Sequence, residues 1–420
     1  MSSVINNSNA NSALVNTIQA SESMTMSSVV YSTEPVAPLH AMQYLPVDKA
    51  SGSVSTNGQM HFHIPKYGTM SQCLLSYKLK NTGTDAWTAG EAFDFCQRIK
   101  SIDLLSSSRT ISTLTRADLI CQFSDLKQTQ FNPVFQSCLK NRTATPAGGA
   151  PTTIAAGGEL DFTIPLVFGL FKSENTQINT SFNEPCQIRV NWENPSYGTG
   201  AGAAPTVVIE LADPQLKIRY KSYPEAATSQ MLSENYGDRP ELNMLSTRWY
   251  DESPKDHPHS GAAGALQTVK VELRNTEVVS DFFVYVRAKQ VAAGGVNVFK
   301  PQQIEKLVLR ASGQELVNLT FHELAFMKLD DEGYANQIGV TDDTAGTANV
   351  AKVQTGVYDQ EGVSNGFSLR EMNSVEMELT IRPDAGVDAG DIYEIVVAER
   401  CLAIYAVSSS TGRLTLSLAN

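Results

Sequence analysis

One internal repeat constrains the fold of this chain more than any other feature. Residues 99–119 align with residues 304–324 without a gap. The aligned pairs are Ile102 with Leu307, Leu104 with Leu309, Ile111 with Leu316, Leu114 with Leu319, Thr115 with Thr320 and Asp118 with Glu323. Each copy has the pattern of a strand, a polar turn, a second strand and the start of a helix. A repeat of this kind predicts a chain built from two copies of one domain.

The helix start is the most specific part of the repeat. Thr115 and Asp118, like Thr320 and Glu323, have the spacing of a capping box. In this motif the threonine oxygen accepts a hydrogen bond from a free backbone amide, and the carboxylate accepts one from the amide of the cap residue. We therefore expect a short helix after the second strand of each copy.

Three further landmarks recur in the same order in both halves. Residues 75–79 resemble residues 283–287, and residues 216–220 resemble residues 402–405. The alternation of Met60, Phe62 and Ile64 is matched by that of Val269, Val271 and Leu273. The first copy is the longer one, with its excess in two runs rich in Gly, Ala, Pro and Thr, residues 141–158 and 197–205. Insertions of that composition belong in loops.

The runs between turn signals are short and alternate between apolar and polar residues, which is typical of strands. Each copy has room for about eight strands, the number in a jelly roll. We therefore predict an all-β protein made of two tandem eight-stranded jelly-roll β-sandwiches, with a few short helices in loops. The predicted divisions are a flexible N-terminal arm (1–50), a first jelly roll (51–222), a linker (223–264) and a second jelly roll (265–420).

Composition excludes several classes of protein. Only 18% of the residues are charged, no apolar run reaches the length of a membrane span, and no secretory signal peptide is recognisable. The net charge is −12, and the first Lys or Arg is Lys49. An acidic chain without a basic arm argues against sequence-independent binding to nucleic acid, and no direct sequence-specific binding is expected either.

The sequence assigns no catalytic, cofactor-binding or metal-binding residues. It lacks the nucleophile elbow, the P-loop and the zinc helix motifs. His61 and His63 would share one face of a strand, where a solvent-facing pair is the preferred interpretation over metal ligands. His257 and His259 lie among acidic residues, within the prolines of the predicted linker. The acidic residues at 330–332 and 342–343 lack the spacing of a calcium-binding loop, and we interpret them as solvated loops. Because none of these patterns singles out a site, we predict no enzyme activity and no cofactor.

Cysteines and tryptophans favour structural roles. The six cysteines are scattered without a C-x-x-C pair, as expected of buried free thiols. They are Cys73, Cys96, Cys121, Cys138, Cys186 and Cys401. Trp192 and Trp249 are expected to be buried in the sandwiches rather than exposed as platforms for sugar or base stacking. The sequons at Asn141, Asn179 and Asn318 carry little meaning without a secretory signal.

The tandem repeat, the opening of each half and one apolar strand together resemble the double jelly-roll major capsid proteins of icosahedral DNA viruses. The segments that carry the resemblance are residues 60–79, 99–119, 161–166 and 304–324. It implies a homotrimer whose six rolls form a pseudo-hexagonal capsomer of a virion shell. The implied partners are neighbouring capsomers, penton and minor capsid proteins and an internal viral membrane. The implied location is the virion, after synthesis inside the host cell, and the Ser- and Asn-rich arm would order beneath neighbouring capsomers.

Two other functions fit a tandem β-sandwich. The first is a carbohydrate-binding or adhesin protein, which an export route and measurable glycan binding would distinguish. The second is a sandwich-fold glycoside hydrolase, which needs two carboxyl groups facing each other across a groove. Acidic residues are abundant in this chain, but the sequence singles out no such pair.

Overall fold

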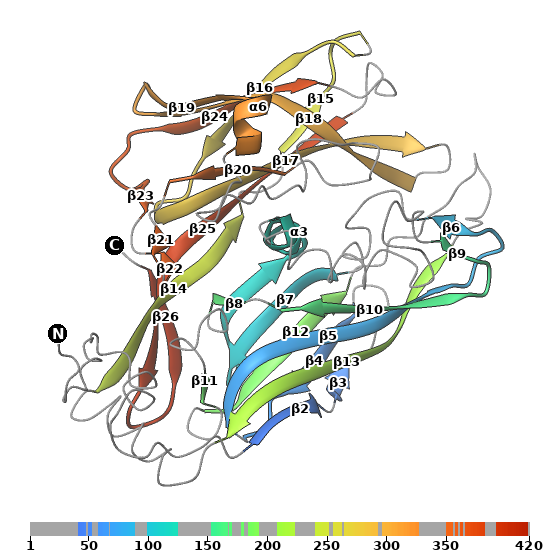
Figure 1. Cartoon of the computed structure of the whole chain (residues 1–420), viewed down its shortest axis with the longest axis vertical. Helices are drawn as coiled ribbons and strands as arrows, with labels where there is room; N and C mark the ends of the chain where they lie inside the picture. Colours follow the sequence, from blue (N-terminus) through green and yellow to red (C-terminus); the bar gives the residue numbers. More distant parts are fainter. Residues whose placement is uncertain are drawn as a thin grey trace.

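The computed structural model describes the two halves of the chain as layered β-structure (Figure 1). The described residues are 41–47, 49–52, 58–66, 68–88, 99–124, 153–166, 168–169, 178–179, 184–192, 208–222, 240–251, 255–262, 264–292, 296–326, 350–355, 358–359, 362–363, 366–382 and 392–418.

The first half forms two five-stranded sheets. One has the order β10 (Glu159–Pro165), β5 (Thr69–Asn81), β13 (Ile209–Ser222) and β2 (Ala41–Val47), and β11 (Ile178–Asn179) also pairs with β5. The other has the order β3 (Lys49–Gly52), β4 (Gln59–His63), β12 (Cys186–Trp192), β7 (Ile99–Ser106) and β8 (Arg109–Thr115). Helix α3 (Arg116–Ser124) follows β8 directly. A short pair, β6 (Trp87–Thr88) with β9 (Thr153–Ile154), lies outside these sheets.

The second half repeats this arrangement. One layer has the order β14 (Glu241–Asp251), β25 (Ile392–Ser408), β17 (Val278–Ala292) and β20 (Val350–Gln354). The other has the order β16 (Gln267–Leu273), β24 (Val375–Arg382), β18 (Val296–Ala311) and β19 (Gln314–Thr320), followed by α6 (Phe321–Phe326). Additional strands pair with β25 or β17, namely β15 (Lys255–Pro258), β26 (Leu414–Leu418) and β23 (Phe367–Ser368). β21 (Tyr358–Asp359) pairs with β22 (Gly362–Val363).

The two halves therefore share one topology, and the all-β, double jelly-roll prediction is confirmed. The order β10-β5-β13-β2 corresponds to β20-β17-β25-β14, and β4-β12-β7-β8 corresponds to β16-β24-β18-β19. In the second half the two layers are continuous because β18 pairs with β17 up to Gln302 and with β24 from Gln303 onward. We call the first half roll 1 and the second half roll 2.

The hairpins at the centre of the repeat match residue by residue. Ile102 pairs with Leu114 as Leu307 pairs with Leu319, and both hairpins have a register shift at the same point, after Leu104 in one and after Leu309 in the other. The turn residues Ser107 and Ser312 both have positive φ, 55° and 50°. Equal bulges and equal turn geometry in two distant segments support the duplication that the sequence indicates.

Two of the landmark matches differ from the structure. Leu216 pairs with Leu75 as Val397 pairs with Val284, so residues 216–220 correspond to residues 397–401 and not to 402–405. The match of residues 75–79 with 283–287 is wrong by one residue. In β5, Leu75 and Tyr77 face the interior of roll 1, whereas in β17 the residues that face the interior of roll 2 are Phe282 and Val284. A slip of one position exchanges the two faces of a strand. The sequence hides this slip because β17 is apolar and buried on both faces.

Two predicted boundaries also differ from the structure. Residues 223–264, predicted to be a linker, include β14 and β15, which both pair with β25 in roll 2. Residues 1–50, predicted to be an arm, include β2 and part of β3, while residues 1–40 lie outside the described residues. Pro254 and Pro258 suggested a linker, but Pro258 ends a strand that pairs with β25, a position that tolerates proline.

Candidate functional site: the contact between the two rolls

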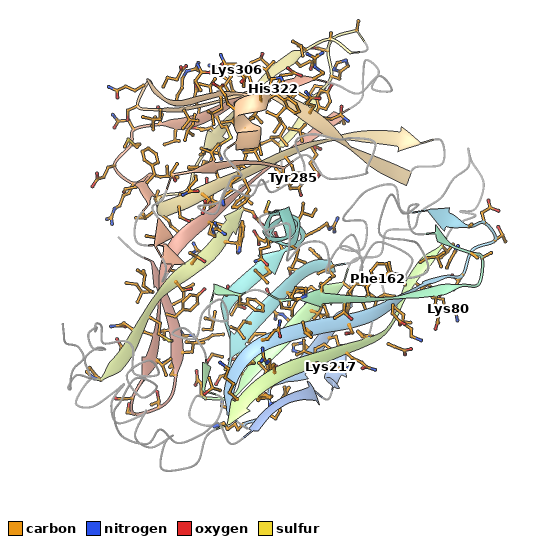
Figure 2. The ribbon with its side chains drawn as sticks, in the orientation of Figure 1. Lys80, Phe162, Lys217, Tyr285, Lys306 and His322 are labelled. Carbon is orange, nitrogen blue, oxygen red and sulfur yellow. The ribbon has the colours of Figure 1, made fainter. Side chains whose placement is uncertain are left out.

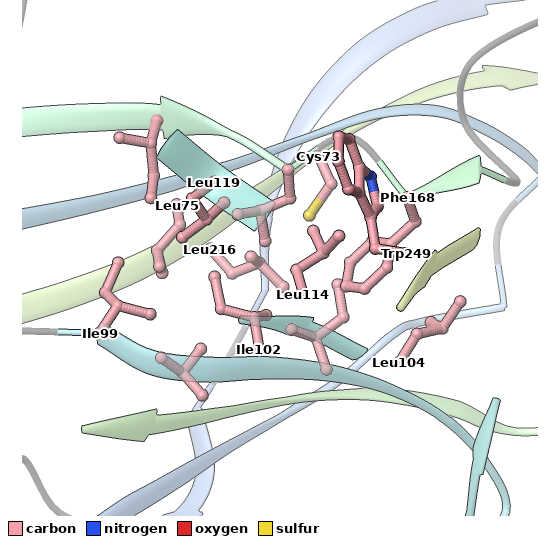
Figure 3. Packing of buried hydrophobic residues seen from close by; sticks show 14 of the residues in the cluster. Cys73, Leu75, Ile99, Ile102, Leu104, Leu114, Leu119, Phe168, Leu216 and Trp249 are labelled. Atoms are coloured by element: carbon pink, nitrogen blue, oxygen red, sulfur yellow. The ribbon is translucent and has the colours of Figure 1, made fainter. Parts of the chain in front are cut away.

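The two rolls are joined by an apolar contact that continues the core of roll 1. Trp249 of β14 and Phe283 of β17 belong to the same buried cluster as Leu114, Leu119 and Phe168 of roll 1. The rings of Trp249 and Phe283 lie 5.2 Å apart. Figure 3 shows Trp249 beside Phe168 among the aliphatic residues of roll 1. Helix α3 lies between the rolls and packs on β14 and β25 (Figure 1).

The backbones approach closely at one point of this contact. The Ser246 hydroxyl of β14 donates to the Gly169 carbonyl oxygen of roll 1 over 2.7 Å. A Cβ atom at Gly169 would lie 1.9 Å from the carbonyl oxygen of Thr247. Only glycine fits there without moving one roll relative to the other.

A pair of carboxyl groups crosses the contact at the start of α3. The Thr115 amide donates to Asp118 Oδ2 over 2.7 Å, and the Asp118 amide donates to Thr115 Oγ1 over 3.2 Å, so the predicted capping box is present. The Thr115 hydroxyl donates to Asp251 of β14 over 2.5 Å. The carboxyl groups of Asp118 and Asp251 lie close enough for the charge of Asp251 to act on Asp118, and Oδ1 of each is buried without another hydrogen-bond partner.

Burial raises the pKa of Asp118 well above its usual range, and the neighbouring charge of Asp251 raises it further. Burial also raises the pKa of Asp251. A hydrogen bond between two carboxyl groups requires one of them to be protonated, so the pair holds its geometry when it shares one proton.

A buried ion pair lies on the same face of roll 2. Asp281 of β17 accepts hydrogen bonds from Arg400 Nε of β25 and from the Ser280 hydroxyl, both over 2.8 Å. Lys352 Nζ of β20 lies 3.7 Å from the other carboxylate oxygen of Asp281. The cationic groups of Arg400 and Lys352 lie over the Phe283 ring, 5.4 and 5.7 Å from its centre. These charges are paired and stacked, as buried charges must be.

A second polar group lies beside it. Arg248 of β14 forms an ion pair with the buried carboxylate of Glu277, with Nε 2.9 Å from Oε2. Asn275 donates to Glu399 of β25, and its own Oδ1 accepts from the Glu277 amide over 3.0 Å. Together these bonds join β14, β25 and the segment between β16 and β17 within roll 2.

A polar hollow of about 360 Å³ lies on the sheet that contains β4, β12 and β7 of roll 1. It is lined by Gln59, Lys100, Ser101, Asp103, Arg189, Asn191 and Trp192. Arg189 lies 2.7 Å from Asp103, which also accepts hydrogen bonds from Thr113 and Asn191. The main charges in the hollow thus bind each other across β7, β8 and β12, which stabilises the sheet.

The histidines considered as ligands do not come together. His61 and His63 face outward from β4, while Met60 and Phe62 face the core. His259 is buried, and its Nδ1 lies 2.8 Å from the Tyr393 hydroxyl. Among the described residues, no group of three or more His, Cys, Asp or Glu side chains has the geometry of a metal site. The acidic segments 330–332 and 342–343 lie outside the described residues.

Trp192 and Trp249 are buried, as predicted, and so are four of the cysteines. Cys73, Cys121, Cys186 and Cys401 are free thiols, and burial raises the pKa of Cys186 and that of Cys401 to about 12. Cys96, Cys138 and Asn141 lie outside the described residues; Asn179 is in β11, and Asn318 is exposed on β19. Neither described helix is long and apolar enough to cross a membrane.

Sequence reasoning missed the charged groups at the contact between the rolls. Their signal is present, because Asp281, Glu399 and Arg400 interrupt the otherwise apolar strands β17 and β25. Ionisable residues inside an apolar strand indicate a buried pair. The sequence cannot show which residues form the pair.

No family model and no curated protein matches the sequence. The structure, however, is similar to solved structures of viral capsid proteins. For VP54 of PBCV-1, solved as a crystal structure and fitted into a reconstruction of the virophage Sputnik, the TM-score is 0.65 at 9% identity, over 93% of this chain and 100% of that chain. For the Faustovirus major capsid protein the TM-score is 0.60 at 11% identity, over 89% of this chain and 91% of that chain. For the mavirus major capsid protein it is 0.57 at 11% identity, over 92% of each chain.

These similar structures are those of structural proteins of virus shells, not of enzymes. Because each comparison covers about nine-tenths or more of both chains, the similarity extends over both rolls and is not limited to one roll. The chain therefore has the double jelly-roll fold of viral major capsid proteins.

Proposed function

We propose that this chain is a major capsid protein whose homotrimers form the pseudo-hexagonal capsomers of an icosahedral virion shell. The observation that carries the proposal is the apolar contact between two rolls of equal topology. Because residues of both rolls are buried in this contact as in the core of a single domain, the two rolls form one rigid unit. A shell built from many copies needs a rigid subunit.

The proposal extends to the partners of such a shell. They are neighbouring capsomers, penton and minor capsid proteins and an internal viral membrane, with the chain located in the virion after synthesis in the host cell. The low proportion of charged residues, 18%, supports it because tiles that meet several neighbours need polar surfaces without strong repulsion.

The carbohydrate-binding alternative is not favoured. Aromatic platforms for sugar binding must be exposed, and the two tryptophans considered for that role, Trp192 and Trp249, are buried. The hydrolase alternative has no support either, because the carboxyl pair that the structure brings together, Asp118 and Asp251, is buried between the rolls rather than facing a groove.

The test is the mass of the purified full chain, measured by light scattering at moderate salt over a range of concentrations. Three chains of 45.6 kDa give about 137 kDa. A stable species of this mass, seen as pseudo-hexagonal particles by electron microscopy, is the expected result. A monomer of 45.6 kDa at every concentration would contradict the proposal.

A further inference from the structure

The repeat leaves one of its two equivalent surfaces covered and the other open. In roll 1, Ile111 of β8 is 4% exposed because it belongs to the cluster shared with roll 2. Its counterpart Leu316 of β19 is 44% exposed. Asp118, buried at the start of α3, likewise corresponds to Glu323, which is exposed at the start of α6. Equivalent residues thus lie in an interface in one copy and on the surface in the other.

The neighbours of the two helices explain this difference. In roll 1, α3 packs on β14 and β25 of roll 2, and β8 contacts β14 and β26. In roll 2, α6 packs on β18, β19 and β20 of its own roll. Apolar Leu316 is therefore presented outward on a strand whose counterpart is docked on another roll.

The receiving surface also has a counterpart. In roll 2 it is the face of β25 that carries Ala398 and Arg400. Leu216 of β13 pairs with Leu75 as Val397 of β25 pairs with Val284, so Leu216 and Val397 are equivalent. One and three residues further along, Lys217 and Arg219 on the outer face of β13 are then equivalent to Ala398 and Arg400. The outer face of β13 in roll 1 is therefore equivalent to the face of β25 that α3 covers in roll 2.

The charges of the two open surfaces are complementary. From residue 216 to residue 222, the charged residues of β13 are all basic, namely Lys217, Arg219 and Lys221, while the acidic residues Glu210 and Asp213 lie nearer the start of the strand. The surface of β19 and α6 carries Glu323 and Glu315, of which Glu315 is ion-paired with Arg310 of β18, so Glu323 supplies the main negative charge. Opposite charges favour docking of the two surfaces and disfavour the docking of either surface on itself.

We propose that the surface of β19 and α6, with Leu316, Thr320 and Glu323, docks on the outer face of β13, with Lys217, Arg219 and Lys221, in a second copy of this chain. This inference rests on the proposed function and names the residues that join the copies. His322 and Lys217 lie at opposite ends of the molecule (Figure 2). The contact joins two different surfaces and is therefore heterologous, from the head of one copy to the tail of the next; such contacts form a ring when the rotation between copies closes, as it does in the proposed trimer.

The first test replaces one exposed leucine at the proposed contact. Leu316→Asp places a charge where a second copy docks, and the expected result is at least a roughly tenfold weaker association by light scattering. Leu266→Asp is the matched control, because Leu266 is 54% exposed outside this surface. It is expected to keep the mass of the wild-type protein.

The second test addresses the receiving face. Lys217→Glu should weaken association, and Lys100→Glu, which changes an exposed lysine on β7 in the other sheet of roll 1, should not. Because opposite charges meet across the contact, the association of the wild-type protein should weaken as salt is raised.

Side-chain footprinting with hydroxyl radicals checks the contact without any substitution. Phe321 and His322 should be labelled less in the associated protein than in the dilute protein, which covers the case in which Leu316→Asp fails to fold. A trimeric Leu316→Asp variant, or unchanged labelling of these residues, would overturn this inference while leaving the proposed capsomer intact. A wild-type protein that stays monomeric would overturn both.

Discussion

Asp281 of β17 and Arg400 of β25 form an ion pair that is almost completely removed from solvent, with 2.8 Å between Oδ2 and Nε. The pair lies beside Trp249 and Phe283, at the face of roll 2 that receives roll 1. Two charges at a contact between domains stabilise it only when both are present.

Asp281→Asn should therefore destabilise the protein strongly. The substitution removes the carboxylate that the buried guanidinium of Arg400 binds, which costs about 3–5 kcal/mol. The measurement is the midpoint of urea unfolding. Lys270→Met, which removes an exposed partner of Glu376, is the control and should shift the midpoint little. Equal midpoints for the two variants would show that the Asp281 pair does not stabilise the contact.

The pair of Asp118 and Asp251 should make stability fall as pH rises. The pKa of Asp118 is raised above its ordinary value of 3.8 in the folded protein, so the folded state binds more protons than the unfolded state above that pH. This contribution is complete below pH 3.8 and is lost as pH rises through the folded pKa. Asp118→Asn keeps a hydrogen-bond donor toward Asp251 without ionising. Its melting temperature should rise relative to that of the wild-type protein between about pH 5 and pH 8.

Glu323, the counterpart of Asp118, supplies a control of opposite sign. Hydrogen bonds from the amide and hydroxyl of Thr320 lower the pKa of Glu323 below its ordinary value of 4.5. Its contribution is present above pH 4.5 and is lost as pH falls through the folded pKa. Glu323→Gln should therefore lower the melting temperature at neutral pH and not at strongly acidic pH. The same pH dependence in both variants would contradict the role of the buried pair.

Gly169→Ala should loosen the contact between the rolls. The added Cβ would lie 1.9 Å from the Thr247 carbonyl oxygen, so the backbone of one roll must move, at a cost of about 1–3 kcal/mol or more. Gly264→Ala is the matched substitution, with a positive φ of 78° but open space around the added atom. Urea unfolding should show the larger loss for Gly169→Ala, with faster proteolysis between the rolls. A larger loss of stability for Gly264→Ala would mean that the close approach of Gly169 to Thr247 does not constrain the two rolls.

The buried thiols should resist modification. Burial raises the pKa of Cys186 and of Cys401 to about 12, so almost no thiolate forms at pH 8. In a variant with Cys96→Ser and Cys138→Ser, the native protein should react with Ellman's reagent much more slowly than the protein in guanidinium chloride, where four thiols should react. Rapid reaction of the native variant would show that the described strands open on the timescale of the assay.

The repeat itself was readable because its pattern is local. A strand, a turn of fixed length and a capping box depend on neighbouring residues, so Thr115 with Asp118 and Thr320 with Glu323 could be found by spacing alone. The alternation in β4 and β16 was readable for the same reason, since one face of each strand is exposed. The match of β5 with β17 slipped by one residue because a strand buried on both faces carries no alternation.

The amino-acid sequence by itself determined the all-β class, the two copies and the burial of Trp192 and Trp249. Only the tertiary structure decided that β14 belongs to roll 2, that Thr115 bonds to Asp251 and that Ile111 is covered while Leu316 is not. The physical reason is that strand patterns and caps are short-range preferences of each segment. Partners across a sheet or between rolls are chosen by packing over more than a hundred residues, and equivalent segments come to differ in burial when one roll docks on the other.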